Sequence, residues 1–320
     1  MHEPALSISR VPCPVVIDAD PGIDDTLALL LALQSPELDV RGIAVSYGNT
    51  LVEHAYRNVV EILRRAGKRR PLAVSARRPL KRSLAVASVT HGPSGLGDAA
   101  VPPAGVILDF VKPLDRLLAD QPEPVTLVTL GPLTGLALAL RTDPELVHAK
   151  VERHIAMIGN LRAAGNTTPT AEFNAWCDPE ATAEVLRAEL PTELVGLDVT
   201  RKLVLTGADI ARLGRADDEQ AVWLHAALRF YLAFHKEHEH LDGCVINDAL
   251  PIAELLAPGT LGFEPVRLTV DLEDGEHRGR TRADPDGARV RMAVTVRHEA
   301  AHRLLVDRVL PTLATAEATR

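Results

Sequence analysis

The sequence predicts an α/β fold of the doubly wound class, in which helices flank a mostly parallel central sheet and a small antiparallel addition follows near the C-terminus. Over the first two-thirds of the 320 residues, short apolar runs typical of buried strands alternate with segments of helical character. No repeat, low-complexity segment or long linker marks a boundary, so we expect one domain that spans residues 1–320. Aromatic residues make up only 3% of the chain, so Leu, Val, Ala and Ile must build the core.

The elements follow in order along the chain. The expected strands of the alternating part are 15–19, 40–46, 72–74, 125–130, 154–158 and 194–196. The expected helices between them are 24–33, 52–66, 104–119, 133–140 and 179–186. Pro179 favours the start of the last of these helices, because Pro suits the first helical position. The rest of the chain predicts a mostly helical region, two antiparallel strands and a closing helix, at 217–256, 266–270, 290–296 and 299–313.

Composition excludes several classes of function. The net charge of −8 predicts neither a nucleic-acid partner nor an acidic membrane partner. Cys13, Cys177 and Cys244 are too few and too scattered for a disulfide framework or a zinc ribbon, so we expect reduced thiols and a cytoplasmic protein. The N-terminus does not have the pattern of a signal peptide, and no apolar run approaches membrane-spanning length.

The most informative segment is the acidic run from Asp18 through Asp20 and Asp24 to Asp25, directly after the apolar residues 15–17. Four carboxylates within eight residues repel one another unless a cation holds them, and Ca²⁺ and Mg²⁺ take oxygen ligands. Open α/β sheets also bind ligands at the carboxyl ends of their strands. A solvated acidic turn at a helix start is the alternative, and it explains one or two Asp but not four.

A strand-end Asp-x-Asp also occurs in haloacid-dehalogenase-type phosphatases, as nucleophile and acid. That family continues with a small residue and then Thr or Val, whereas this chain continues with Pro21, Gly22 and Ile23. The departure argues against that assignment.

Further motifs follow the acidic run along the chain. They are Tyr47-Gly-Asn49-Thr50, His91-Gly-Pro-Ser-Gly-Leu96, Thr129-Leu-Gly131-Pro-Leu-Thr134, the segment from Gly165 to Asn174 with Asp178-Pro179-Glu180-Ala181, and Leu241-Asp-Gly243-Cys-Val-Ile-Asn247-Asp248. Together with the acidic run they resemble, in the same order, the motifs of the inosine-uridine-preferring nucleoside hydrolase family. The resemblance spans most of the chain from Val15 onward, and it implies the fold of that family.

The resemblance also implies a site. One Ca²⁺ would lie at the floor of a pocket, and its implied ligands are Asp20, Asp25, Asp248 and the backbone carbonyl of Leu130, where the family usually has Thr. The side chains implied to bind ribose are Asp24, Asn49, Asn174, and, at the 3′ and 5′ side of the sugar, Asn166 and Glu172. Asp18 would give structural support. Calcium prefers oxygen ligands and can chelate vicinal hydroxyls, which agrees with this set.

The implied reaction is hydrolysis of the N-glycosidic bond of a ribonucleoside to ribose and free base. A calcium-activated water would attack through an oxocarbenium-like transition state, with Asp20 as the general base. Many family members have His before the last metal Asp, where it protonates the leaving base, and this chain has Asn247 instead. Asn is not a Brønsted acid at neutral pH, so another group must act or the rate must be low.

Several histidines are candidates for the missing acid. His91 lies in a motif of the family, although it could also make a structural hydrogen bond. His235, His238 and His240 precede the last metal motif, and the simpler interpretation of them is an exposed polar helix end.

A second function class comes from His298, Glu299 and His302, which match the His-Glu-x-x-His pattern of zinc metalloproteases. Only Asp307 and Glu317 follow as possible third carboxylate ligands, so an amphipathic closing helix is the simpler interpretation. A ribosyl-binding protein with weak catalysis is a third class, favoured by Asn247. The resemblance further implies a homodimer or homotetramer with a small-molecule nucleoside as partner, and it leaves the preferred base open.

Overall fold

The computed structural model describes residues 11–103, 108–310 and 313. Its centre is a sheet with the strand order β10-β9-β11-β6-β5-β4-β1-β2-β3, counted over these residues. All neighbours from β3 to β11 pair in parallel, and β9 pairs antiparallel with both β11 and β10. The strands are β1 Cys13–Ala19, β2 Leu38–Val45, β3 Leu72–Val74, β4 Val125–Thr129, β5 Val151–Ala156, β6 Thr192–Leu194, β9 Leu261–Val270, β10 Thr281–Ala283 and β11 Ala288–Val296. The predicted doubly wound, mostly parallel sheet is confirmed.

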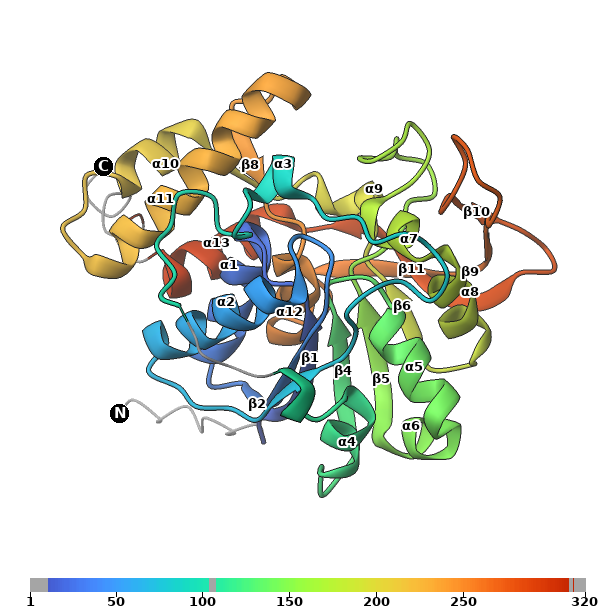
Figure 1. Ribbon diagram of the computed structural model, residues 1–320. Helices are drawn as coiled ribbons and strands as arrows, with labels where there is room; N and C mark the ends of the chain where they lie inside the picture. The colour runs from blue at the N-terminus through green and yellow to red at the C-terminus, as the bar shows by residue number, and fades with distance from the viewer. Residues whose placement is uncertain (1–10, 104–107, 311–312, 314–320) are drawn as a thin grey trace, which may run out of the picture.

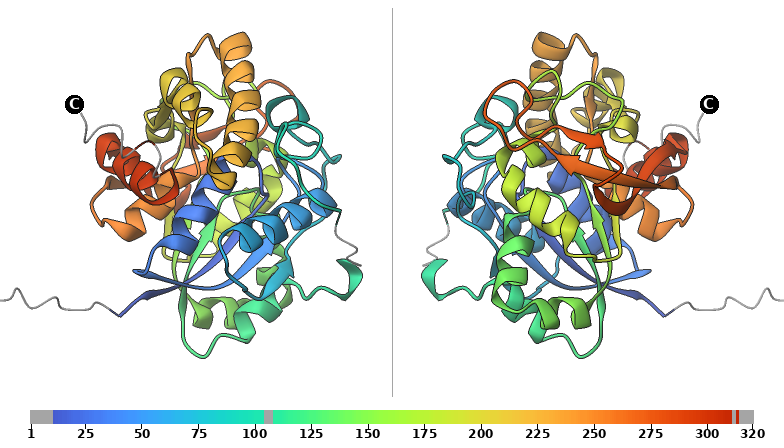
Figure 2. Two further views of the ribbon diagram at one scale, coloured as in Figure 1. Left: turned by 90° about the vertical axis from the view of Figure 1, so that its left-hand side faces the viewer. Right: turned by 90° about the vertical axis from the view of Figure 1, so that its right-hand side faces the viewer.

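Helices cover both faces of this sheet (Figures 1 and 2). One face carries α1 Ile23–Gln34, α2 Val52–Arg65, α12 Ala249–Leu256 and α13 His298–Val309. The opposite face carries α4 Leu114–Ala119, α5 Thr134–Thr142, α6 Pro144–Lys150 and α8 Pro179–Arg187. Side chains alternate along each strand, so Val15 and Ile17 of β1 pack on the first face and Val16 packs on the second. Aliphatic side chains make up most of both cores, as the composition requires.

A group of smaller elements lies above the carboxyl ends of the strands (Figure 1). It comprises α3 Ser88–His91, α7 Phe173–Cys177, α9 Leu197–Thr200, β7 Val204–Thr206, α10 Gly207–Leu213, α11 Glu219–Phe234, η2 His235–Glu239 and β8 Gly243–Val245. β7 and β8 form a separate two-stranded antiparallel sheet. None of the described helices is both long enough and apolar enough to span a membrane.

Three expectations for the elements need correction. Residues 104–107 of the predicted helix 104–119 lie outside the described part, and the rest forms a 3-10 turn, η1 Leu108–Phe110, followed by α4. Pro113 separates the two, because the residue before a proline is disfavoured in the helical region. The region 217–256 contains strand β8, which the helical prediction missed. The expected antiparallel strands 266–270 and 290–296 are confirmed as parts of β9 and β11, and the correction concerns their extent: β9 begins at Leu261, β10 pairs with it, and β11 also joins the main sheet by pairing in parallel with β6.

The strand order places the candidate site. Between β1 and β4 the direction of winding reverses, and ligands of open α/β sheets bind at such a switch point. The acidic run follows β1, and Leu130 follows β4 directly. Leu130 N–H donates to the Asp18 carbonyl at 2.8 Å, which holds the two strand ends side by side.

Candidate active site

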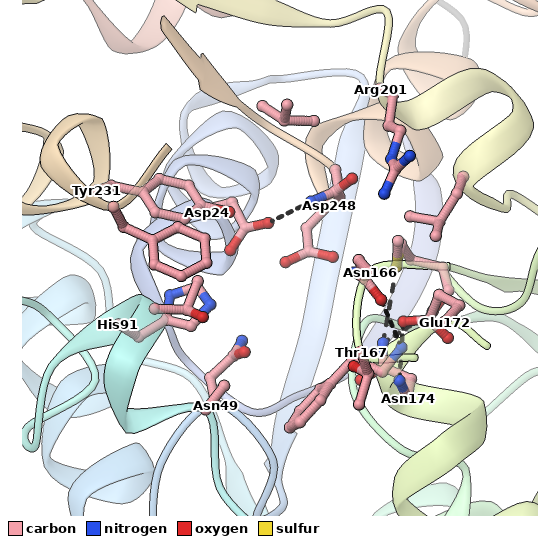
Figure 3. A pocket seen from close by; sticks show the side chains of 18 of the residues that line it. Asp24, Asn49, His91, Asn166, Thr167, Glu172, Asn174, Arg201, Tyr231 and Asp248 are labelled. Carbon is pink, nitrogen blue, oxygen red and sulfur yellow. Dashed lines mark hydrogen bonds between the residues drawn. The ribbon is translucent and has the colours of Figure 1, made fainter. Parts of the chain in front are cut away.

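A pocket opens above this switch point, and the empty space in and around it, open solvent included, is ≈ 690 Å³. Asp24 and Asp248 line its base, and Asp20 and Asp25 are buried next to them; these four carboxylates are here called the floor. One side, here called the aromatic wall, is formed by His91 of α3 with Tyr231 and Phe234 of α11. The opposite side, here called the sugar wall, is formed by the following residues: Asn166, Thr167, Glu172, Asn174 and Arg201 (Figure 3).

Three of the floor carboxylates form a group that could hold a metal ion. Asp24, Asp25 and Asp248 each offer an oxygen within 4.8 Å of the others. Asp25 Oδ2 accepts hydrogen bonds from Gly22 N–H at 2.9 Å and from the Asn49 side-chain amide at 2.7 Å. The Oδ1 atoms of Asp20, Asp24 and Asp25 are buried and have no hydrogen-bond partner within the described structure. Unpaired buried carboxylate oxygens are the donor set that a hard divalent cation requires.

Burial makes this floor electrostatically unstable by itself. Desolvation raises the pKa of Asp25 to about 6, and Asp24 adds to that increase. Desolvation also raises the pKa of Asp20 and that of Asp248 well above the usual range, with further increases from neighbouring floor carboxylates. Buried like charges are retained in proteins where a partner charge compensates them.

Asp20 lies beside the three-carboxylate group and is held by a tight turn. Its Oδ2 accepts the backbone N–H of Asn49 at 2.7 Å. A Cβ atom at Gly48 would come within 2.0 Å of that oxygen, and Gly48 has φ +154°, which only glycine adopts readily. A Cβ at Gly131 would come within 2.6 Å of Asp20 Oδ1. The two glycines let the strand-end loops close around this carboxylate.

The carbonyl of Leu130, an implied metal ligand, faces the same region. It accepts the side-chain amide of Asn174 at 2.7 Å, and the same amide donates to the Met157 carbonyl at 3.0 Å. A carbonyl oxygen has two lone pairs, so one remains for a metal ion. Asn174, predicted to bind ribose, therefore also fixes this loop.

His91 reaches the pocket from the end of α3. Its Nδ1 accepts the backbone N–H of Ile23 at 3.1 Å, which places the ring proton of the neutral tautomer on Nε2. Burial lowers the pKa of His91 to about 4, although Asp25 acts in the opposite direction. Its ring centroid lies 5.2 Å from that of Tyr231. At neutral pH this imidazole is therefore an uncharged hydrogen-bond donor at the aromatic wall.

Asn247 lies between β8 and α12, next to Asp248. Its side-chain amide donates to Asp24 Oδ2 at 3.3 Å, and its own Oδ1 is buried without a partner in the described structure. Asn247 therefore orients Asp24, and it supplies no titratable proton.

The sugar wall is organised by the loop before α7. Glu172 caps α7, and its two oxygens accept the backbone N–H groups of Gly159, Asn174 and Ala175 at 2.8–3.0 Å. Desolvation nevertheless raises the pKa of Glu172 to about 7. Asn166 Oδ1 accepts the Phe173 N–H at 2.9 Å at the pocket mouth. Glu172 and Asn166, which the resemblance implies as ribose-binding residues, both line the pocket, and each also accepts a backbone hydrogen bond there.

The pocket also contains residues that sequence reasoning missed. Tyr231, Phe234 and Arg201 line it, yet none is part of a motif identified above. His235 is buried beneath the aromatic wall, with Nδ1 2.9 Å from the Tyr231 carbonyl and Nε2 accepting Val245 N–H at 3.4 Å. His238 and His240 are exposed. The sequence did offer a signal for this side of the pocket. Helical spacing puts Tyr231, Phe234 and His235 on one face of a helix end, shortly before the motif that ends at Asp248.

The His-Glu-x-x-His match lies on the surface. His298 and His302 belong to α13, with half and about a third of their side chains exposed. Within the described part of the chain, the only group of three or more His, Cys, Asp or Glu side chains close enough to share a metal is the floor group. Asp307 lines the same shallow groove without completing a ligand set, and Glu317 lies outside the described residues. The structure gives no support to the zinc protease alternative.

Comparison with known proteins agrees with this fold. The family model of the inosine-uridine preferring nucleoside hydrolases matches residues 15–303. The chain therefore belongs to that family, and it is a hydrolase of N-glycosyl compounds.

Three individual relatives match most of this chain. The pyrimidine-specific ribonucleoside hydrolase RihA of Klebsiella pneumoniae (strain 342) is 40% identical over 250 residues, which cover 77% of this chain and 80% of RihA. The plant nucleoside hydrolase PpNRh1 superposes with a TM-score of 0.84 at 31% identity, covering 93% of this chain and 99% of that structure. A purine-preferring ribonucleoside hydrolase from Gardnerella vaginalis gives 0.85 at 27% identity, with coverage of 94% and 99%.

Proposed function

We propose that this protein catalyses the calcium-dependent hydrolysis of pyrimidine ribonucleosides to ribose and free base. The observation that carries the proposal is the carboxylate floor, where Asp20, Asp24 and Asp25 each have a buried oxygen without a partner beneath an open pocket. The pyrimidine preference rests on the 40% identity to RihA.

The donor set of the floor fits a calcium ion. All candidate ligands are hard oxygens: the carboxylates of Asp20, Asp25 and Asp248 and the carbonyl of Leu130. Asp24 belongs to the same close group, and its bond from Asn247 leaves Oδ1 for a ribose hydroxyl or the ion. Calcium bound here would lower the pKa of a water and chelate vicinal hydroxyls of the sugar.

Asp20 is the general base in this mechanism. Asn49 N–H fixes its Oδ2, so Oδ1 is the oxygen free to accept the proton of the attacking water. A calcium ion held by the floor would keep Asp20 ionised despite its burial, so that this carboxylate could accept a proton. The two neighbouring glycines leave room for this geometry.

In this mechanism the floor binds the ribose, and the aromatic wall binds the base. The carboxylates of the floor orient the ribose hydroxyls and stabilise the positive charge that develops on the ring as the C1′–N bond breaks. The base lies against His91 and Tyr231, where planar aromatic surfaces are available. His91 Nε2–H then donates a hydrogen bond to the leaving base, whose proton is finally supplied by solvent or by another group of the pocket.

Release of ribose from a panel of purine and pyrimidine ribonucleosides tests this function. We expect uridine and cytidine to be the best substrates. Chelation of the metal should abolish the activity, and added calcium should restore it. Full activity after exhaustive chelation would overturn the metal-dependent mechanism, and a preference for inosine would overturn the pyrimidine assignment.

Asn247 favours a second candidate, a ribosyl-binding protein with weak catalysis. The residue occupies the place of an acid and cannot protonate a base. Calorimetric binding of ribose or uridine without measurable ribose release would support this candidate. Turnover at rates typical of enzymes would exclude it.

A further inference from the structure

The sugar wall carries a positive charge that the proposed reaction does not use. Arg201 follows α9 and is the only Lys or Arg among the described residues that line the pocket. Its guanidinium points into the pocket near Asn166 (Figure 3). Within the described part of the chain it forms no ion pair, and its side-chain hydrogen bond goes from Nη2 to the Gly165 carbonyl at 2.9 Å.

Two further residues of the same wall offer hydrogen-bond donors. Asn166 uses its Oδ1 to accept the Phe173 N–H, and among the described residues its amide nitrogen has no acceptor, so both of its N–H groups can serve a ligand. The hydroxyl of Thr167 lines the same edge of the pocket. The bond to Gly165 holds Arg201 in place and leaves several of its five N–H donors for a ligand. This corner of the pocket therefore combines hydrogen-bond donors with the one Lys or Arg among the described lining residues. The Glu172 carboxylate on the same wall is turned to three backbone N–H groups, which its two oxygens accept.

The covalent geometry of a ribonucleoside determines what reaches this corner. C1′ and C4′ lie on either side of the ring oxygen, so the base and the 5′ substituent leave the same face of the sugar but point apart, and the 2′- and 3′-hydroxyls lie on the opposite face. With the hydroxyls on the carboxylate floor and the base at the aromatic wall, C5′ extends toward the sugar wall. Arg201 lies on that wall, across the pocket from His91 and Tyr231 (Figure 3).

We propose that Arg201, Asn166 and Thr167 form a subsite for an anionic group on the 5′ carbon, so that ribonucleoside 5′-monophosphates are substrates. A guanidinium binds phosphate oxygens bidentately, and neutral donors complete such sites. Asn166 and Thr167 are exposed at the mouth, so a phosphate there keeps part of its hydration. The inference rests on the proposed function.

The reaction on this substrate is the same hydrolysis. Water adds to C1′ while the C1′–N1 bond breaks, one water proton goes to the general base, and the leaving uracil gains a proton. The products are uracil and ribose 5-phosphate, with no change of oxidation state and no loss of the phosphate.

The test compares kcat/KM for uridine and uridine 5′-monophosphate in the wild type and in Arg201→Gln. We expect the wild type to use the monophosphate at least as well as uridine, and we expect Arg201→Gln to lower the monophosphate-to-uridine ratio by about tenfold or more. Arg162→Gln is the matched control, because Arg162 is exposed in the same loop region and does not line the pocket. It should leave that ratio unchanged.

Each alternative gives a different result. If Arg201 only tethers the loop at Gly165, Arg201→Gln lowers both activities by the same factor, and the subsite is overturned. If uridine is cleaved and the monophosphate is not, the proposed function stands and this inference fails. If neither is cleaved, the proposed function fails.

Calorimetric titration with ribose and ribose 5-phosphate tests the subsite without turnover. Tighter binding of ribose 5-phosphate that Arg201→Gln abolishes supports the subsite. Equal binding of the two sugars overturns it.

Discussion

The floor and the aromatic wall of the pocket are built in different ways. The floor comes from strand ends: Asp20 and Asp25 follow β1, and the Leu130 carbonyl follows β4. The aromatic wall comes from helices above the sheet, with His91 at the end of α3 and Tyr231 on α11. The sheet fixes the floor through backbone pairing, whereas the wall depends on how helices distant in sequence pack together. In the proposed function, the floor therefore supplies the chemistry of bond cleavage, and the aromatic wall supplies the contacts to the base.

This difference explains what could be predicted from the sequence. The acidic run after a buried strand indicated the floor, because strand ends of a parallel sheet meet at one edge. Asn49 was implied only by the family resemblance, as a ribose-binding residue, and the structure places its side-chain amide on Asp25. Tyr231 was not predicted, because a single aromatic residue on a helix reads as core until the tertiary contact with His91 is known. Arg201, which is partly buried, was not predicted either, because nothing in the neighbouring sequence marks it as facing a pocket.

The sheet itself was predicted better than its last strands. Because both of its faces are packed against helices, the parallel part of the sheet has strands that are short apolar runs in the sequence. Whether β11 would pair with β6 or form a separate hairpin with β9 depends on long-range register, which local periodicity does not contain. The short strand β8 was missed because it lies between α11 and α12, inside a region of mostly helical character.

The largest effect on catalysis is expected when one carboxylate of the floor is removed. We expect Asp20→Ala and Asp25→Ala each to lower kcat by about a thousandfold or more, since each loses a proposed metal ligand and Asp20 is also the proposed base. Steady-state ribose release at saturating calcium measures this. Asp115→Ala is the control, because Asp115 is a buried carboxylate on α4 that lies outside the pocket. A wild-type rate in either floor variant would remove the mechanism proposed here.

Asn247 contacts the floor at Asp24, and in the proposed mechanism the leaving base lies next to it. Asn247→His introduces a titratable acid beside Asp248 and Asp24. If protonation of the base limits the rate, we expect kcat on uridine or inosine to rise by about tenfold or more. A kcat/KM profile should then gain a new descending limb at high pH, as the imidazolium loses its proton.

An unchanged rate in Asn247→His would show that protonation is not limiting or comes from elsewhere. Asn247→Gln is the matched control, because it keeps an amide and adds no acid. A rate increase in Asn247→Gln would assign the gain to altered packing around Asp24 rather than to acid catalysis.

The smallest effect is expected at the aromatic wall, from His91. Because burial lowers its pKa from 6.5 to about 4, about 1% of this imidazole is protonated at pH 6. It therefore acts as a neutral donor, and His91→Phe should lower kcat/KM by about two- to tenfold through the loss of one hydrogen bond. The ratio of wild-type to variant kcat/KM should stay constant between pH 5.5 and 8, because the charge on His91 does not change in that range.

His91→Gln also tests whether His91 acts as a neutral hydrogen-bond donor. Its amide can accept the Ile23 N–H and still offer a donor to the base, so it should recover part of the activity that His91→Phe loses. If the wild-type advantage over both variants instead disappears as pH rises from 6 to 7, His91 works as a charged acid. In that case substrate binding would have to bring His91 out of its buried environment, which would raise its pKa again. The aromatic wall would then change its conformation when substrate binds.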